Sequence, residues 1–260
     1  MDFKLFYKVR NMIKFLVDHP AAFINDKKIL VISDIHIGIE HYLYQHGIVI
    51  PPQAEKFQKI IESLIDLTKA KTLVILGDVK YKVPGTSMIE LKEIPKFLEN
   101  LSEKIKIIVT KGNHDDFLET ITPEDVNMYS SRGFKLGRYG FFHGHAWPSK
   151  KLMQCDYLFM GHLQPAFEFR DKLGYTSIQQ VWLKGKLNQD LIKKKYKITK
   201  TGKLNIIVVP SFNRLSGSLA VNKTLKEDLL GPLLTNNILD ISKTVAYLLD
   251  GTCLGRVIRT

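Results

Sequence analysis

The sequence lacks any apolar run long enough to cross a membrane. Of its 260 residues, 45% are hydrophobic, but no stretch approaches the roughly 18 uninterrupted apolar residues of a spanning helix. Residues 1–20 mix basic and apolar positions and contain no apolar block followed by small residues, which argues against a secretory signal. The sequence therefore predicts no membrane partner.

Cysteine is also scarce, with only Cys155 and Cys253. Two cysteines are too few for a disulfide framework and fit a reducing compartment, so we expect a cytoplasmic protein. Internal repeats, low-complexity tracts and linkers rich in Pro, Gly or Ser are lacking as well. We therefore expect one domain over residues 1–260, long enough to bury a substantial core, with residues 184–203 as a basic, exposed excursion.

Acidic residues are few relative to basic ones. There are 26 Asp and Glu against 38 Lys and Arg, which gives a net charge of +12 and a pI near 9.5. Such a surface attracts polyanions over a Debye length or more. Two interpretations stay open: a solvated lysine-rich surface of the kind common in heat-adapted proteins, or a surface for nucleic acid or another phosphorylated ligand.

The first half of the sequence alternates between apolar runs of branched residues and segments with apolar residues at helical spacing. This alternation of strand and helix predicts an α/β arrangement with a parallel sheet. Pro95 is expected to interrupt the second helix or mark its restart. The predicted strands are 27–34, 71–78 and 104–115, and the predicted helices are 54–70 and 88–101.

After residue 130 the pattern changes to short strands, so we expect a mixed, β-rich second half packed on the first. Phe141, Phe142 and Phe159 alternate with small or polar neighbours and are expected in the core. The predicted strands cover 134–145, 156–162, 166–170, 178–183 and 204–212.

Five of these apolar runs end in side chains that can bind a metal. In open α/β sheets, ligands bind beyond the carboxyl ends of the strands. Each strand end alone is ambiguous, because an aspartate there is often a turn residue and a lone histidine is often a hydrogen-bonded core residue. The ordered set of five is hard to obtain by accident. Its members are Asp34 and His36, Asp78, Asn113 with His114 and Asp115, His143 with His145, and His162.

These residue types suit a site for two metal ions. Divalent ions of borderline softness accept imidazole and carboxylate together, and a carboxylate such as Asp78 can bridge two of them. Asn113 would add a neutral oxygen. Two ions about 3.5–4 Å apart can clamp the attacking and leaving oxygens of an in-line phosphoryl displacement.

The ordered motifs D-x-H, G-D, G-N-H-D, H-G-H and G-H resemble those of the calcineurin-like metallophosphoesterases, over residues 29–164. Residues 33–52 and 208–218 look like the small DNA-ligase-associated phosphoesterases and their archaeal relatives. The resemblance implies an α/β sandwich of two facing mixed sheets flanked by helices. It also implies manganese, iron, zinc or a mixture as cofactor.

The resemblance also implies roles for the strand-end residues. His114 would stabilise the transition state or protonate the leaving oxygen, and Asp115 would orient its ring. His143 is preferred to His145 as a ligand because it directly follows its strand, which leaves His145 as a substrate contact. The implied ligands are Asp34 and His36 for the first ion, Asp78 as the bridge, and Asn113, His143 and His162 for the second.

Two positions depart from the family pattern. Gln164 stands where a histidine normally completes the first ion, and Tyr81 replaces an acid or histidine that supports the site from outside. An amide oxygen can coordinate a hard ion such as Mn²⁺ or Mg²⁺ but holds Zn²⁺ or Fe²⁺ more weakly than imidazole does. We therefore expect the first ion to be bound weakly. The alternative is that the metal site has degenerated.

Four further residues are candidates for substrate contact, each against the alternative of an exposed loop residue. His41 and His46 are expected in a long loop after the first strand, near the mouth of the site. Lys80 lies two residues past the bridging acid, and Arg214 follows the last predicted strand.

The function that these observations predict is a metal-dependent phosphodiesterase acting on a nucleotide or nucleic-acid diester. A metal-bound hydroxide would attack phosphorus while His114 assists the departing alkoxide. The alternative is a nucleic-acid-binding or scaffold protein with a degenerate metal site, which Gln164, Tyr81 and the positive charge favour.

Overall fold

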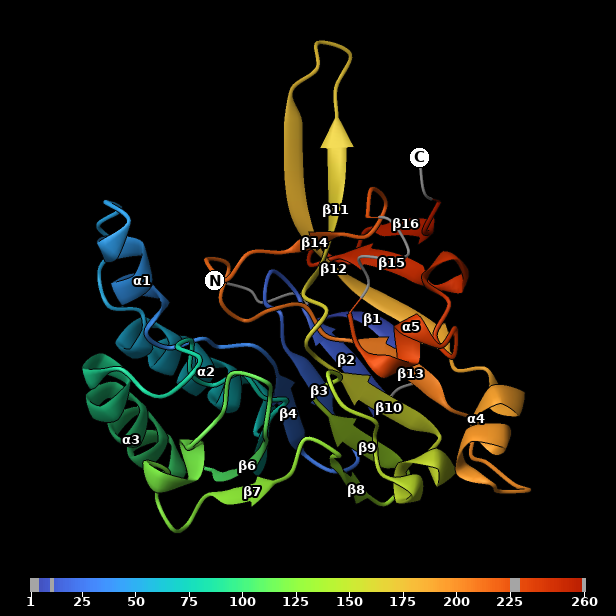
Figure 1. The fold of residues 1–260 in the computed structure, drawn as a ribbon, viewed down its shortest axis with the longest axis horizontal. Coiled ribbons are helices and arrows are strands. Elements are labelled where there is room, and N and C mark those ends of the chain that lie inside the picture. The colour runs from blue at the N-terminus through green and yellow to red at the C-terminus, as the bar shows by residue number, and fades with distance from the viewer. Residues whose placement is uncertain (1–4, 10–11, 225–229, 259–260) are drawn as a thin grey trace.

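The strands form two mixed sheets that face each other (Figure 1). This computed structural model describes residues 5–9, 12–224 and 230–258. In the first sheet, neighbouring strands are antiparallel from β1 to β4 and parallel from β4 to β7. In order across the sheet, its strands are β1 (Leu5–Val9), β2 (Ile13–Leu16), β3 (Ala22–Ile24), β4 (Ile29–Ile32), β5 (Thr72–Ile75), β6 (Lys106–Thr110) and β7 (Asn127–Tyr129).

The second sheet has a parallel centre, in which β10 lies between β9 and β13, and antiparallel flanks. Strands β11 and β12 continue beyond the sheet as a hairpin that projects from the body of the molecule (Figure 1). The strands in chain order are β8 (Phe134–Leu136), β9 (Tyr139–Phe142), β10 (Tyr157–Met160), β11 (Pro165–Arg170), β12 (Thr176–Lys186), β13 (Asn205–Val208), β14 (Leu219–Ala220), β15 (Val245–Leu248) and β16 (Cys253–Arg256).

The apolar runs of the first sheet are continuous because both of its faces are covered. Along β4, Ile29 and Val31 join an apolar cluster shared with the second sheet, whereas Leu30 and Ile32 join the cluster under the helices. Side chains alternate between the faces of a strand, so a strand buried on both faces is apolar at every position. The shared cluster supports the interpretation of the chain as one domain, which stays our proposal.

Helices α2 and α3 cover the outer face of the first sheet, and α4 packs beside the second (Figure 1). No helix in the described ranges is both long and apolar enough to cross a membrane. The helices are α1 (Ile39–Gln45), α2 (Ala54–Thr68), α3 (Met88–Ser102), α4 (Gln189–Tyr196) and α5 (Pro232–Thr235), with single 3₁₀ turns at Leu118–Thr120, Lys150–Gln154 and Ile241–Lys243.

The predicted fold class is confirmed, and the predicted strands and helices of the first half are present. The expected interruption at Pro95 is wrong, because α3 runs through it. A capping box between Ser87 and Glu90 starts this helix, and the burial of Phe97 and Leu98 beyond the proline holds its second half.

Two predictions for the second half need correction. The segment 134–145 is not one strand but a hairpin of β8 and β9 that turns at Gly137, which has a φ of 59°. The excursion 184–203 contains α4, anchored by the fully buried Ile192. The segment is rich in lysine, so the single apolar face that α4 buries is hard to recognise in the sequence. The expected core phenylalanines Phe141, Phe142 and Phe159 are fully buried.

Candidate metal centre

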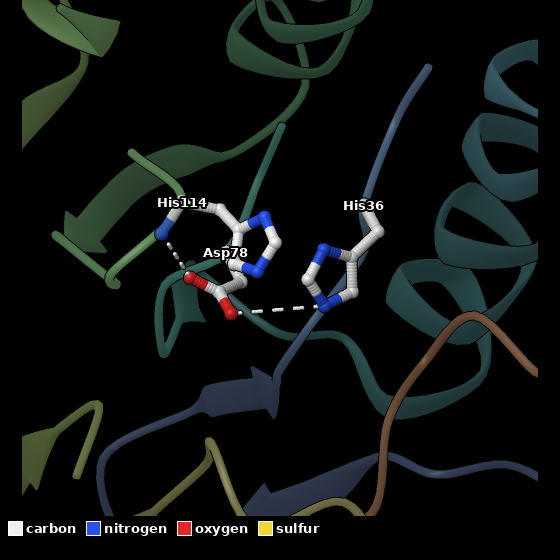
Figure 2. Close-up of side chains that lie close together, drawn as sticks. All are labelled: His36, Asp78 and His114. Carbon is white, nitrogen blue, oxygen red and sulfur yellow. Dashed lines mark hydrogen bonds and ion pairs between the residues drawn. The ribbon is translucent and has the colours of Figure 1, made fainter. Parts of the chain in front are cut away.

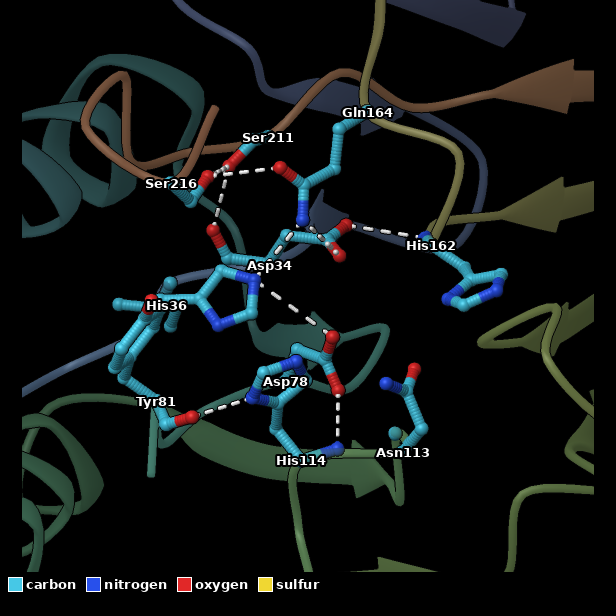
Figure 3. Close-up of polar contacts among 12 residues, drawn as sticks. Asp34, His36, Asp78, Tyr81, Asn113, His114, His162, Gln164, Ser211 and Ser216 are labelled. Carbon is cyan, nitrogen blue, oxygen red and sulfur yellow. Dashed lines mark hydrogen bonds and ion pairs between the residues drawn. The ribbon is translucent and has the colours of Figure 1, made fainter. Parts of the chain in front are cut away.

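The carboxyl ends of five strands meet at one edge of the sandwich. In the first sheet, Ile32 of β4 pairs with Ile75 of β5, which pairs with Val109 of β6, so these strands end level. In the second sheet, Phe142 of β9 pairs with Met160 of β10. The polar residues that follow four of these strands gather in one place in Figure 3, and His143, which follows β9, contacts Asp78 and His162. This convergence follows from parallel pairing, which puts like ends together.

Asp78 lies at the centre of this group. Its Oδ2 is 3.7 Å from His36 Nε2 and 3.4 Å from His143 Nε2, and its Oδ1 accepts the backbone N–H of His114 at 2.9 Å (Figures 2 and 3). Burial opposes ionisation, but His143, His36 and His114 outweigh it and lower the pKa of Asp78. Asp78 is therefore a buried carboxylate that stays charged.

Two groups of side chains could each hold a cation, and both include Asp78. One consists of His36, Asp78 and His114, and the other of Asp78, His143 and His162; within each group the ligand atoms lie within 4.8 Å of one another. Imidazole and carboxylate together suit Mn²⁺, Fe²⁺ and Zn²⁺. The donor set thus fits divalent ions, and Asp78 has the position that a bridging ligand requires.

The histidines around Asp78 differ in protonation. Burial lowers the pKa of His36 to about 4 and that of His162 to about 3, so both rings are neutral near pH 7 and have a lone pair for a cation. Burial would also lower the pKa of His143, but Asp78 and Asp34 outweigh it and raise this pKa to about 9. The same carboxylates would attract a divalent ion in place of that proton.

The residues expected around the second ion lie close together. Asp78, His143 and His162 form one of the two groups, and Asn113 Oδ1 is 3.2 Å from His143 Nε2. His145 lies beside them, with its ring centroid 5.3 Å from that of His143 and 5.9 Å from that of His162. Burial lowers the pKa of His145 to about 4. Its place at the rim of this group is compatible with the predicted substrate contact.

Around the expected first ion, Gln164 lies differently from the prediction. Its amide nitrogen, and not its oxygen, faces the site, 3.3 Å from Asp34 Oδ1 and 2.9 Å from His36 Nε2 (Figure 3). The amide oxygen accepts the Ser216 hydroxyl at 2.9 Å. An amide nitrogen is a donor and does not bind a cation, so the predicted coordination through the oxygen is wrong for this arrangement. The Gln164 amide thus contacts both residues that were expected to hold the first ion.

We expect that Gln164→His will increase the affinity for the first ion. The imidazole would remove the amide donor and add a ligand that Zn²⁺ and Fe²⁺ prefer. Calorimetric titration of metal-free protein should find the first ion weak and the second tight in the wild type, and the first ion bound more tightly in the variant. Gln179→His, an added histidine at an exposed position of β12, is the matched control. Two equally tight ions in the wild type would contradict this account.

His114 is oriented by a backbone carbonyl. Its Nδ1 donates to the carbonyl oxygen of Tyr81, which leaves Nε2 as the nitrogen that can take up or release a proton (Figure 3). The predicted orientation of this ring by Asp115 is wrong. The Asp115 carboxylate is fully buried and accepts four backbone N–H groups, from Gly112, Asp78, Val79 and Lys80. Asp115 thus ties the loop after β6 to the loop after β5.

Five residues of the centre have a left-handed backbone conformation. Asp34, His36, Asp78, His162 and Gln164 all have φ between 47° and 65°, a region that non-glycine residues rarely adopt. Such residues cost on the order of 1–3 kcal/mol each and persist where the surrounding structure imposes them. The close approach of the loops also requires Gly112, because a Cβ there would overlap Asp78 Oδ1.

The other predicted substrate contacts are dispersed. The Lys80 side chain is fully buried, and its three N–H groups have three partners, the carbonyl oxygens of Lys82 and Gly85 and the Asp116 carboxylate. The predicted substrate contact of Lys80 is therefore wrong. The remaining three candidates are on the surface: His41 lines a cavity that His114 also lines, His46 contacts the Tyr42 carbonyl, and Arg214 lines a separate cavity with Asp18.

Sequence reasoning missed the residues that hold the loop after β4. Ser211 donates its hydroxyl to the Asp34 carbonyl oxygen at 2.8 Å, and Asn213 donates to the Ile35 carbonyl oxygen at 2.9 Å. The Ser33 hydroxyl and the His162 N–H contact the Asp34 carboxylate, and burial raises the pKa of Asp34 to about 6. Polar residues that follow parallel strands gather at one edge of the sheet. Ser211 and Asn213 could have been found in this way, because they follow β13, which is parallel to β10.

Comparison with known proteins gives one family and a set of similar structures. The family model for calcineurin-like phosphoesterases matches residues 27–240. Nuclease MPE from Pseudomonas putida has a similar structure, with a TM-score of 0.60 at 14% identity over 97% of this chain and 100% of that chain. Yfce, a phosphoesterase from E. coli, aligns with a TM-score of 0.42 at 15% identity over 89% of this chain and 99% of that one. No curated protein matches the chain.

Proposed function

The chain belongs to the calcineurin-like phosphoesterase family, and from this premise we propose that it hydrolyses phosphodiesters of nucleotides or nucleic acids at a centre of two divalent ions. One observation carries the proposal: Asp78 is common to two groups of histidines that could each hold a cation. The net charge of +12 supports a polyanionic or nucleotide substrate. The likeness to the nuclease supports the fold, so the substrate class rests on the charge.

The proposed ligands are the members of the two groups, with Asn113 added and with Asp34, which shares the Gln164 amide with His36, in place of His114. His36, Asp78 and Asp34 would hold one ion, and Asp78, Asn113, His143 and His162 the other. Cations held there would polarise the phosphoryl oxygens and lower the pKa of a water molecule. We expect Mn²⁺, because it accepts both the imidazole nitrogens and the oxygens of this set.

His114 is the proposed acid for the departing oxygen. With Nδ1–H held by the Tyr81 carbonyl, its Nε2 is the nitrogen that exchanges a proton with substrate. The ring centroids of His114 and His36 are 4.8 Å apart, which places this nitrogen beside the ligands. His145 is proposed to contact a phosphoryl oxygen. A cytoplasmic location, expected from the two free cysteines, stays part of the proposal.

Hydrolysis should require added metal. After chelation and dialysis, we expect the protein to lose activity on bis(p-nitrophenyl) phosphate and to regain it with Mn²⁺ more fully than with Mg²⁺, because three of the six proposed ligands are imidazole nitrogens, which Mg²⁺ accepts less readily. Circular dichroism before and after chelation checks that the fold is kept. Full turnover in the chelated sample would contradict the proposal.

The second candidate function is a nucleic-acid-binding protein with a degenerate centre. The observation that favours it is the Gln164 amide, which lies against both Asp34 and His36. Elemental analysis of the purified protein separates the two functions. A phosphodiesterase should retain at least one equivalent of metal at the group of Asp78, His143 and His162, whereas a binding protein need hold none.

A further inference from the structure

A cavity of about 270 Å³ opens beside the candidate metal centre. It lies between α1 and residues 81–87, and His114 belongs both to its wall and to one of the two metal-binding groups. Pockets for drug-sized ligands measure roughly 300–1,000 Å³, so this cavity has room for one small organic group and not for a length of polymer. A group bound there would be next to the ring of His114, the residue that we propose as the acid.

Two tyrosines give the cavity aromatic walls. The ring centroids of Tyr42 and Tyr81 are 5.3 Å apart, with the planes inclined by 51°. The Tyr81 ring is also 5.8 Å from the His114 ring and 5.8 Å from the His36 ring, so it lies between the cavity and the centre (Figure 3). Tyr42 is 43% exposed. Planar faces of this kind stack on the bases of nucleic acids with little regard to sequence.

The wall that carries Tyr81 is held rigidly by a buried acid. Glu90 is fully buried, and its carboxylate accepts the backbone N–H groups of Tyr81 at 2.9 Å, Lys82 at 2.6 Å and Ser87 at 2.6 Å. The buried Lys80 ammonium holds the carbonyl oxygens of the same loop. Residues 81–87 are therefore fixed before any ligand binds.

The opposite wall is held in the same way. Glu40, in the first turn of α1, accepts the backbone N–H groups of Gly38 at 3.1 Å and Gln53 at 2.6 Å. This fixes the helix that carries Tyr42 and His41. Binding to a preformed pocket avoids the entropy loss of ordering its walls, which favours affinity for a small group.

We propose that this cavity binds a planar nucleobase on the organic group that leaves from the phosphate. The inference deepens the proposed function, because it names the group that lies on the His114 side of the scissile bond. The aromatic faces of Tyr42 and Tyr81 recognise the flat base. His41 and Gln45, whose side-chain nitrogens are 3.1 Å apart, line the same cavity and offer polar contacts to the edge of the base.

The test compares two ligands that differ only in the base. Thymidine 5′-monophosphate and 2-deoxyribose 5-phosphate are titrated calorimetrically into the Mn²⁺-loaded protein. We expect the nucleotide to bind about tenfold more tightly in the wild type, because of base stacking. Tyr81→Ala should reduce this ratio to less than about threefold, and Tyr81→Phe, which keeps the ring, should preserve it. Because the hydrogen bond from His114 is accepted by the backbone carbonyl of Tyr81, neither variant removes it.

Tyr44→Ala is the matched control. Tyr44 lies on the same helix as Tyr42, is 64% exposed and does not line the cavity. It should therefore leave the ratio unchanged. Equal affinity for the two ligands in the wild type, or the same loss in Tyr44→Ala as in Tyr81→Ala, would overturn the proposal.

The two proposals fail in different ways. If the protein hydrolyses diesters but binds the two ligands with equal affinity, the proposed function is supported and base binding in the cavity is refuted. If the ratio of the two affinities depends on Tyr81 but the protein hydrolyses no diester, base binding in the cavity is supported and the proposed function is overturned.

Discussion

Asp78→Asn is expected to slow turnover strongly and to weaken the binding of both ions at once. The carboxylate is shared by both candidate groups, and an amide is neutral and offers one oxygen where the carboxylate offers two. Loss of a residue that only supports a metal ligand typically costs 10–100-fold in affinity or activity, so loss of a ligand common to two ions should lower activity by roughly 10²–10⁴-fold. Calorimetric titration and the rate on bis(p-nitrophenyl) phosphate measure the two effects.

The variant should remain folded. The amide oxygen can still accept the backbone N–H of His114, and the side chain has the same shape. Asp66→Asn, on the exposed side of α2, is the matched control and should bind metal and turn over as the wild type does. An Asp78→Asn protein that binds two ions with unchanged affinity would show that Asp78 is not the bridge.

His114→Ala is expected to slow turnover by roughly 10²–10⁴-fold, the contribution of a positioned acid. The variant should keep the ion bound by Asp78, His143 and His162, because His114 is not in that group. The rate is measured at saturating Mn²⁺, and the metal content by elemental analysis of the same sample. Added imidazole should restore part of the rate if the missing group is a proton donor.

The metal content also decides between two roles of His114. The ring lies close enough to His36 and Asp78 to act as a ligand. Asn113→Ala is the comparison variant, because Asn113 is a proposed ligand. If His114→Ala loses metal as severely as Asn113→Ala does, His114 is a ligand and its role as the acid is wrong.

The amino-acid sequence by itself determined the strands and the residues at their ends. An unbroken run of branched apolar residues such as Ile29–Ile32 is stable only when both faces of the strand are buried. A polar residue directly after such a run must lie at the edge of the sheet. Asp34, Asp78 and His143 were predictable for this reason, and their order along the chain indicated the family before any coordinate was known.

Only the tertiary structure decided which partner each buried polar group has. Asp115 was expected to contact the ring next to it in sequence, but it binds the backbone of residues 78–80, and Lys80 binds Asp116 across 36 positions of sequence. The Gln164 amide contacts Asp34 across 130 positions. A carboxylate or amide can bond many different groups with similar energy, so its sequence neighbours do not specify its partner.

The cavity proposed to bind a nucleobase was beyond sequence reasoning for the same physical reason. Its walls come from α1, which was expected to be loop, and from residues 81–87, and they meet because Glu40 and Glu90 are buried and must find donors. A buried charge without hydrogen bonds is destabilising, so the fold brings whichever backbone N–H groups are within reach to these carboxylates. Which groups are within reach depends on how the loops pack, and that is a property of the folded chain alone.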